Sequence, residues 1–118
     1  MLTPESICIL ETSAWQLAHS NTLAELKGWE CFVTIQPHYH MLEREIEREL
    51  VPFCQFANIG ILPYFPLAGG FLTGKYKRGE APPEGTRLGN AVRDKRPGVD
   101  LFLNDDKFAK VEKLQALA

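Results

Sequence analysis

Residues 69–75 contain glycines and a lysine at a spacing that could bind a phosphate. Gly69, Gly74 and Lys75 satisfy G-x-x-x-x-G-K, a pattern in which backbone N–H groups surround an anion and the lysine adds positive charge. A nucleotide P-loop also requires a serine or threonine after the lysine, at the start of a helix. Tyr76 follows instead, and KRGEAPP at 77–83 disfavours a helix because it contains a glycine and two prolines. The pattern therefore argues against a P-loop and leaves an ordinary glycine-rich turn or another kind of phosphate-binding loop.

The chain before this loop is apolar, and residues 59–64 are typical of a buried strand. A strand that ends in a loop of small residues, here 66–70, with a cation behind it suits the phosphate of a cofactor.

The other candidate chemistry is metal binding by His38 and His40, which are two residues apart. No cysteine or carboxylate completes a zinc spacing with them, so we interpret both as ordinary loop residues.

Length and composition bound the class of protein. With 118 residues, 45% of them apolar and 24% charged, the chain has room for one small domain of ordinary globular composition. The net charge of −2 predicts no general affinity for nucleic acid or membranes, and no apolar run approaches the roughly 20 residues that span a bilayer. Cys8, Cys31 and Cys54 lie far apart, which favours reduced, buried thiols and a cytoplasmic location.

Residues 74–98 form a basic segment within this weakly acidic chain, with seven cationic side chains and three anionic ones. Lys77 and Arg78 fit a solvated surface loop. A long segment without clear periodicity is usually functional or disordered, so we also consider a flexible basic flap beside a phosphate-bearing ligand.

The predicted elements alternate between helix and strand. Ser13 and Gln16 fit a capping box and Gly28 fits a C-terminal cap, while Pro52 marks a kink or a restart in a later helix. In chain order the prediction is a strand at 7–10, a helix at 13–27, a strand at 31–36, a helix at 43–57, a strand at 59–64 and a helix from 104 or 105 onward.

This order predicts the α/β class, with about three parallel strands flanked by helices. Three parallel strands make an incomplete sheet whose edges invite pairing, so we expect self-association through them. The last predicted helix reaches residue 118 without a capping signal, and we therefore expect the chain to be part of a longer protein.

Four motifs in this order closely resemble the aldo-keto reductase superfamily, in particular its branch of potassium-channel β subunits and related bacterial oxidoreductases. They are AWQLA at 14–18, FVTIQPHY at 32–39, REIERELVPFC at 44–54 and GILPYFPLAGGFLTGKY at 60–76, within a resemblance that covers about residues 7–118. The resemblance implies a partial (β/α)8 TIM barrel, of which residues 1–118 form an incomplete domain. It also implies NADPH as the cofactor and small-molecule carbonyl compounds as substrates, reduced by hydride transfer.

The resemblance implies roles for named residues. Gln36 matches the glutamine that holds the nicotinamide carboxamide, and Tyr64 matches the aromatic residue that stacks on the nicotinamide ring; taken alone they fit a polar strand end and a core aromatic. Lys75 matches a phosphate-contacting lysine, and Arg87 matches an arginine of the flap that clamps the cofactor. The loop that wraps the pyrophosphate corresponds to Phe65, Pro66, Leu67, Ala68 and Gly69.

Two features depart from the family pattern. Leu10 and Glu11 stand where the family usually has a Ser-Asn pair that hydrogen-bonds the carboxamide, so whether residues 1–11 are native family sequence stays open. His40 stands where asparagine is common.

The family's catalytic Asp, Tyr, Lys and His all precede the matched region. Tyr39, Tyr64 and Tyr76 match other family positions, so we assign no catalytic residue to this chain. Two interpretations follow. The first is a fragment of an NADPH-dependent oxidoreductase that carries part of the cofactor site and is inactive alone. The second is a non-enzymatic interaction protein that associates with full-length relatives.

Overall fold

The chain falls into two compact units, Met1–Pro66 and Leu67–Ala118, and the computed structural model describes residues 6–117 of it. Within the described residues, no helix is long and apolar enough to cross a membrane.

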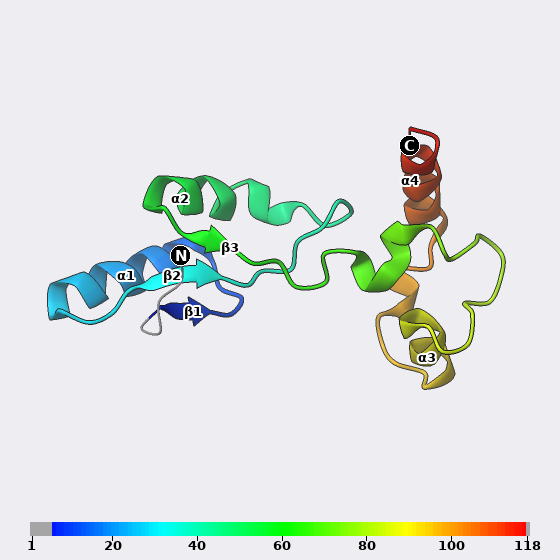
Figure 1. Ribbon diagram of the computed structural model, residues 1–118, viewed down its shortest axis with the longest axis horizontal. Coiled ribbons are helices and arrows are strands. Elements are labelled where there is room, and N and C mark those ends of the chain that lie inside the picture. Colours follow the sequence, from blue (N-terminus) through cyan, green and yellow to red (C-terminus); the bar gives the residue numbers. More distant parts are fainter. Residues whose placement is uncertain (1–5, 118) are drawn as a thin grey trace. The chain divides into compact units, whose positions relative to one another are not determined.

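The first unit is a three-stranded parallel sheet with two helices (Figure 1). The strands lie in the order β1-β2-β3, so that β2 is central and each partner is parallel to it. The bounds are β1 Ile7–Ile9, α1 Ala14–Lys27, β2 Phe32–Ile35, the short 3-10 helix η1 Glu45–Glu47, α2 Leu50–Ala57 and β3 Gly60–Ile61. The predicted α/β class with three parallel strands is confirmed.

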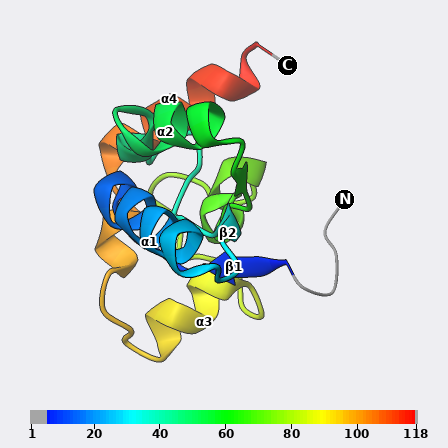
Figure 2. The same cartoon turned by 90° about the vertical axis from the view of Figure 1, so that its left-hand side faces the viewer.

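The core of this unit lies between β2 and the two helices, which cover the same side of the sheet (Figure 2). Leu17 of α1 and Ile35 of β2 are fully buried, and Cys54 of α2 is nearly so. Burying a leucine or isoleucine side chain stabilises a fold by about 1.5–3 kcal/mol, so this cluster fixes the strands against the helices. The carboxyl ends of the strands are thereby held at one edge.

Side-chain caps explain where α1 begins and what it contacts. Ser13 and Gln16 form the predicted capping box, and Gly28 ends the helix in the left-handed conformation. Asn21, in the middle of α1, bonds both backbone groups of Phe32: its amide donates to the carbonyl and its oxygen accepts from the N–H, each at 2.9 Å. This pair anchors the start of β2 to the helix.

The predicted helix at 43–57 is two helices, because Pro52 forces a restart. Pro52 is the third residue of α2, where a missing N–H leaves no intrahelical hydrogen bond unmade. The predicted strand at 59–64 is also shorter than expected: β3 ends at Ile61, and only an isolated bridge pairs Tyr64 with His38.

The second unit packs around Phe71, which is 1% exposed. Its ring lies edge-on to Phe108 at 4.9 Å between centroids and stacks on Tyr76 at 6.2 Å. The elements are η2 Ala68–Thr73, α3 Arg87–Arg93, η3 Val99–Leu101 and α4 Asp105–Gln115. Asn104 caps α4 as predicted, since its side chain accepts from the Lys107 N–H.

Two sequence interpretations of this segment were wrong. Residues 74–98 contain α3, which begins at a Thr86 cap, and so are not without regular structure. Arg78 is also more than a solvated cation: its guanidinium bonds Glu112 at 3.1 Å and pairs with Asp105 at 3.5 Å, tying the chain to α4. The expectation of buried cysteines holds for Cys54, whereas Cys31 is half-buried and Cys8 is exposed.

Candidate cofactor-binding site

Gln36 and Tyr64 follow the carboxyl ends of the neighbouring strands β2 and β3. The Gln36 N–H donates to the Ile9 carbonyl at 3.0 Å, which extends the β1–β2 pairing past the end of β2. The Tyr64 N–H donates to the Pro37 carbonyl at 3.0 Å, which ties the chain after β3 to the chain after β2. In a (β/α)8 barrel the edge formed by the carboxyl ends of the strands carries the chemistry, and both residues lie at it.

The Tyr64 ring has three neighbours within this unit. The His38 ring stacks on it, with centroids 5.2 Å apart and planes 12° from parallel, and Phe65 lies edge-on at 6.2 Å. Its hydroxyl donates to the Glu11 carboxylate at 3.0 Å. Burial, followed by this hydrogen bond, raises the pKa of Tyr64 above its ordinary value.

The loop predicted to wrap a pyrophosphate has an unusual backbone. Phe65 (φ 59°) and Ala68 (φ 51°) adopt the left-handed conformation, which costs a residue with a side chain about 1–2 kcal/mol. Gly69 (φ 67°) and Gly70 (φ 89°) continue it, dividing η2 into two turns, and the Thr73 hydroxyl donates to the Gly70 carbonyl at 2.7 Å. Strain of this kind often marks a ligand-binding loop.

Lys75 lies over this turn. A Cβ added to Gly70 would stand 2.7 Å from both Nζ and Cε of Lys75, so the ammonium occupies the space that a side chain at position 70 would take. The ammonium also lies 5.3 Å from the centre of the Tyr76 ring. None of the ion pairs found within residues 6–117 involves Lys75, although the side chain is exposed. The arrangement places one cation directly against the backbone of Gly70, in the space that the missing side chain leaves.

Tyr76 connects this turn to α3. Its ring is 5% exposed, and its hydroxyl donates to the Gly69 carbonyl at 3.4 Å and accepts from the Leu88 N–H at 3.3 Å. Arg87, the first residue of α3, is exposed and follows the Thr86 cap. The second unit thus contains Ala68, Gly69, Lys75 and Arg87 on a connected framework.

The residues predicted from the sequence are divided between the two units. Gln36, Tyr64, Phe65 and Pro66 belong to the first, and the rest to the second. The first unit therefore holds the two residues assigned to the nicotinamide, Gln36 and Tyr64, together with the first two residues of the predicted pyrophosphate loop. The second unit holds the rest of that loop and both cations assigned to the phosphates: Leu67, Ala68, Gly69, Lys75 and Arg87.

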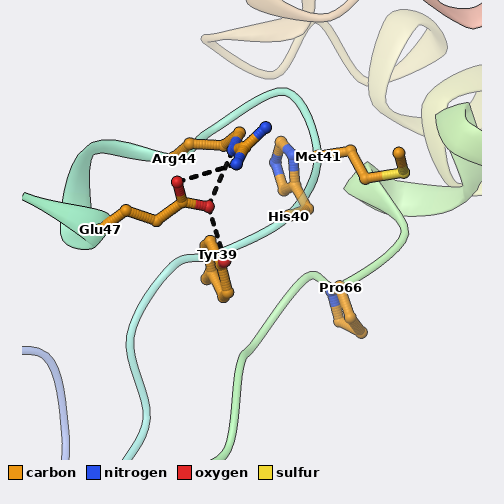
Figure 3. A pocket seen from close by; sticks show the side chains of 6 residues that line it. All are labelled: Tyr39, His40, Met41, Arg44, Glu47 and Pro66. Carbon is orange, nitrogen blue, oxygen red and sulfur yellow. Dashed lines mark hydrogen bonds and ion pairs between the residues drawn. The ribbon is translucent and has the colours of Figure 1, made fainter. Parts of the chain in front are cut away.

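A polar network that was not predicted from the sequence lines a cavity of about 420 Å³ in the first unit (Figure 3). The Arg44 guanidinium makes two bonds to the Glu47 carboxylate, at 2.8 and 2.9 Å, and the Tyr39 hydroxyl donates to the same carboxylate at 2.7 Å. Arg44, and then Tyr39, lowers the pKa of Glu47, while the bond to Glu47 raises the pKa of Tyr39. Because these groups satisfy one another, we interpret the network as a brace for the loop after His38. The Arg-x-x-Glu spacing at 44–47 was its only sequence signal.

His38 and His40 lie close together but are used within the protein. Their rings pack edge to face at 4.9 Å, and the Leu42 N–H donates to Nδ1 of His40 at 3.2 Å. Across residues 6–117 there is no group of three or more His, Cys, Asp or Glu side chains that could hold a metal ion.

Comparison with known proteins adds independent information. Residues 6–118 match the model of the Aldo/keto reductase family. An aldo-keto reductase from Pseudocercospora fijiensis is 31% identical over 110 residues, which cover 93% of this chain and 37% of the relative. Aflatoxin B1 aldehyde reductase member 2 from Rattus norvegicus is 35% identical over 82 residues, or 67% and 22% of the two chains.

Among solved structures, a glycerol dehydrogenase from Gluconobacter oxydans superposes with a TM-score of 0.57 at 25% identity, covering 95% of this chain and 32% of that one. The chain spans between 17% and 37% of the length of the curated relatives it matches. Its strands and helices form part of a TIM barrel. The chain belongs to the aldo/keto reductase family.

Proposed function

We propose that this chain carries part of the cofactor site of an NADPH-dependent carbonyl reductase. One observation carries the proposal: the Lys75 ammonium lies over a left-handed turn in which Gly70 has no side chain. Because Gly70 has no side chain, the Lys75 ammonium can lie against this turn, and a cation held at a turn of left-handed residues attracts an anion. A dinucleotide phosphate fits this combination.

Gln36 and Tyr64 would hold the other end of the cofactor. An amide side chain both donates and accepts, as a carboxamide requires, and an aromatic ring offers a flat surface for a nicotinamide. NADPH supplies the hydride when it is bound, and the residues of this chain bind and orient it. We assign no general acid here, so reduction of a carbonyl substrate requires a segment that supplies one.

The proposed function has consequences for the domain, the location and the cofactor preference of the protein. We propose that residues 1–118 are an incomplete aldo-keto reductase domain, located in the cytoplasm, and that NADPH is preferred over NADH. Titration with both dinucleotides tests the preference, because only NADPH carries the 2′-phosphate.

Substitutions of Lys75 and Tyr64 test the two halves of the site separately. Lys75→Ala should weaken NADPH binding by about 1–3 kcal/mol at low salt, the range for a hydrogen bond to a charged group, towards the lower end because the side chain is exposed. High salt should shrink the loss. Tyr64→Ala, rebuilt in a full-length relative, should slow single-turnover hydride transfer more than it weakens binding. An unchanged Kd for Lys75→Ala at low salt would show that the phosphate assignment is wrong.

A second candidate function, association with another chain, follows from the sheet. β1 and β3 are the outer strands of the described sheet, and Ile7, Val33 and Leu62 are each more than a third exposed. Unpaired strand edges beside apolar side chains favour pairing with another strand. Sedimentation of the purified chain should show association, whereas a compact monomer with a sharp cooperative melt would contradict it.

A further inference from the structure

Glu11 contacts Tyr64 although 53 positions separate them in the sequence. Glu11 follows β1 and Tyr64 follows β3, which are the two outer strands of the sheet. Their hydrogen bond, at 3.0 Å, therefore crosses over the end of the central strand β2, a span of about 10 Å at the usual strand spacing. Glu11 stands at one of the two positions where the chain departs from the family's Ser-Asn pair.

The chain after β2 supports the same ring from its face. His38 stacks on Tyr64 with planes 12° from parallel, and the Tyr64 backbone N–H is bonded to the Pro37 carbonyl. A tyrosine side chain has two rotatable bonds, and here its backbone, one ring face and its hydroxyl are each held by a different group. The residue is still 39% exposed, so the ring is fixed in orientation without being enclosed.

We propose that Glu11 is a positioning residue: together with His38 it fixes the plane of the Tyr64 ring so that the nicotinamide can stack on it. This inference rests on the proposed function. Glu11 thereby replaces the direct carboxamide contact of the family's Ser-Asn pair with an indirect one. An aromatic surface held in one orientation binds a flat ligand better than a mobile one, because less conformational entropy is lost on binding.

Three variants of the 118-residue chain distinguish the effect of holding the Tyr64 ring in one orientation from the effect of the Glu11 charge. Glu11→Gln keeps an oxygen acceptor for the Tyr64 hydroxyl, Glu11→Leu removes it, and His38→Ala removes the ring stacked on the face. Each is titrated with NADPH and with 2′-phospho-ADP-ribose, which has the phosphates but no nicotinamide. We expect Glu11→Leu to weaken NADPH binding about fivefold, the worth of one ordinary hydrogen bond, without changing the affinity for 2′-phospho-ADP-ribose. Glu11→Gln should restore most of the loss, and His38→Ala should weaken NADPH binding as well.

A second readout needs no cofactor. The chain has three tyrosines, so ¹³C labelling at Cζ gives three signals, and Tyr64→Phe assigns the relevant one. Besides Glu11, the charged or titratable groups around this ring are His38 and, behind it, His40. In Glu11→Leu the Tyr64 hydroxyl should titrate at lower pH than in the wild type, because the carboxylate that disfavours its ionisation is gone.

The outcomes separate this inference from the function on which it rests. If the wild type binds 2′-phospho-ADP-ribose and NADPH but Glu11→Leu changes neither affinity, the role of Glu11 is refuted and the proposed function stands. Equal weakening of both ligands assigns Glu11 a merely structural role. Tighter NADPH binding by His38→Ala shows that His38 occupies the place of the nicotinamide, which also overturns the inference. A wild type that binds neither ligand refutes the proposed function and this role with it.

Discussion

Gly70→Ala should weaken phosphate binding because the added methyl group displaces the Lys75 side chain, although Lys75 itself is not substituted. The added Cβ would stand 2.7 Å from Nζ of Lys75, well inside the 3.5–4.0 Å of an ordinary contact, so the ammonium must move by about 1 Å. The end of a lysine moves easily, so the clash itself costs little. The loss appears in binding, because the cation no longer lies over the turn.

The size of the effect follows from the two residues involved. A hydrogen bond to a charged group contributes about 1.5–3 kcal/mol, and solvent screening reduces it at the exposed Lys75 to about 1 kcal/mol, or roughly fivefold in Kd. Alanine at φ +89° also strains the backbone by about 1–2 kcal/mol. Gly79→Ala is the matched control: Gly79 has φ +75°, and an added Cβ would meet nothing within 4 Å. It should strain the backbone equally and leave binding unchanged.

Calorimetric titration with 2′-phospho-ADP-ribose at low and high salt measures the effect. Gly70→Ala should lose affinity, Lys75→Ala should lose somewhat more, and the double variant should bind no worse than Lys75→Ala, since the glycine acts through the lysine. Additive losses in the double variant, or equal losses in Gly70→Ala and Gly79→Ala, would refute the reasoning.

Three further results are expected. The purified chain should show no NADPH-dependent reduction of nitrobenzaldehydes or methylglyoxal above a buffer blank; turnover that a substitution in this chain abolishes would overturn this. Glu47→Gln should destabilise the protein most above about pH 5, because the pKa of Glu47 is lowered by Arg44 and Tyr39 in the folded state, and the difference from wild type should vanish as the pH falls through that folded pKa. Denaturation midpoints across pH measure it, and a constant difference contradicts the network. Cys54, buried and with a raised thiol pKa, should be alkylated by iodoacetamide far more slowly than the exposed Cys8; equal rates by mass spectrometry would contradict the packing.

Elements whose signals are local were predicted well from the sequence. α1 begins and ends where its capping box and Gly28 place it, because those caps use only groups within a few residues of the helix ends. The restart at Pro52 and the Asn104 cap of α4 are equally local. Ala118, which the last predicted helix reaches, lies outside the described residues.

Elements that depend on distant contacts were not predicted. α3 is seven residues long and contains Gly89, a poor helix former, so its pattern is weak. Its support comes from elsewhere: Leu88 is 4% exposed, and the Tyr76 hydroxyl accepts from its N–H. The strand at 59–64 was overpredicted because its partner is interrupted: the Leu62 and Tyr64 N–H groups still donate to the Ile35 and Pro37 carbonyls, but Pro37 has no N–H to donate back to this strand.

The candidate site also combines features that are local in the sequence with a contact between distant residues. The glycines and Lys75 could be singled out from sequence, because a small-residue turn with a cation is a compact pattern. The contact between Glu11 and Tyr64 could not be, because it depends on the order β1-β2-β3, which brings the ends of two outer strands within reach of each other. The position of Glu11 was noticed only as a departure from the family.

Tyr76 shows how the second unit replaces what a P-loop would provide. In a P-loop the residue after the lysine is a hydroxyl that serves a bound magnesium ion. Here the Tyr76 hydroxyl makes two hydrogen bonds within the protein: it donates to the Gly69 carbonyl and accepts from the Leu88 N–H in the first turn of α3. Lys75 and Arg87 therefore both belong to the second unit, whereas Gln36 and Tyr64 belong to the first. In the proposed function, the cations assigned to the phosphates and the residues assigned to the nicotinamide thus lie in different units. Under the proposed function, substitution of Gly70 or Lys75 should therefore lower affinity for the phosphates whether or not a nicotinamide is present, whereas substitution of Glu11 or His38 should lower affinity only for a ligand that carries the nicotinamide.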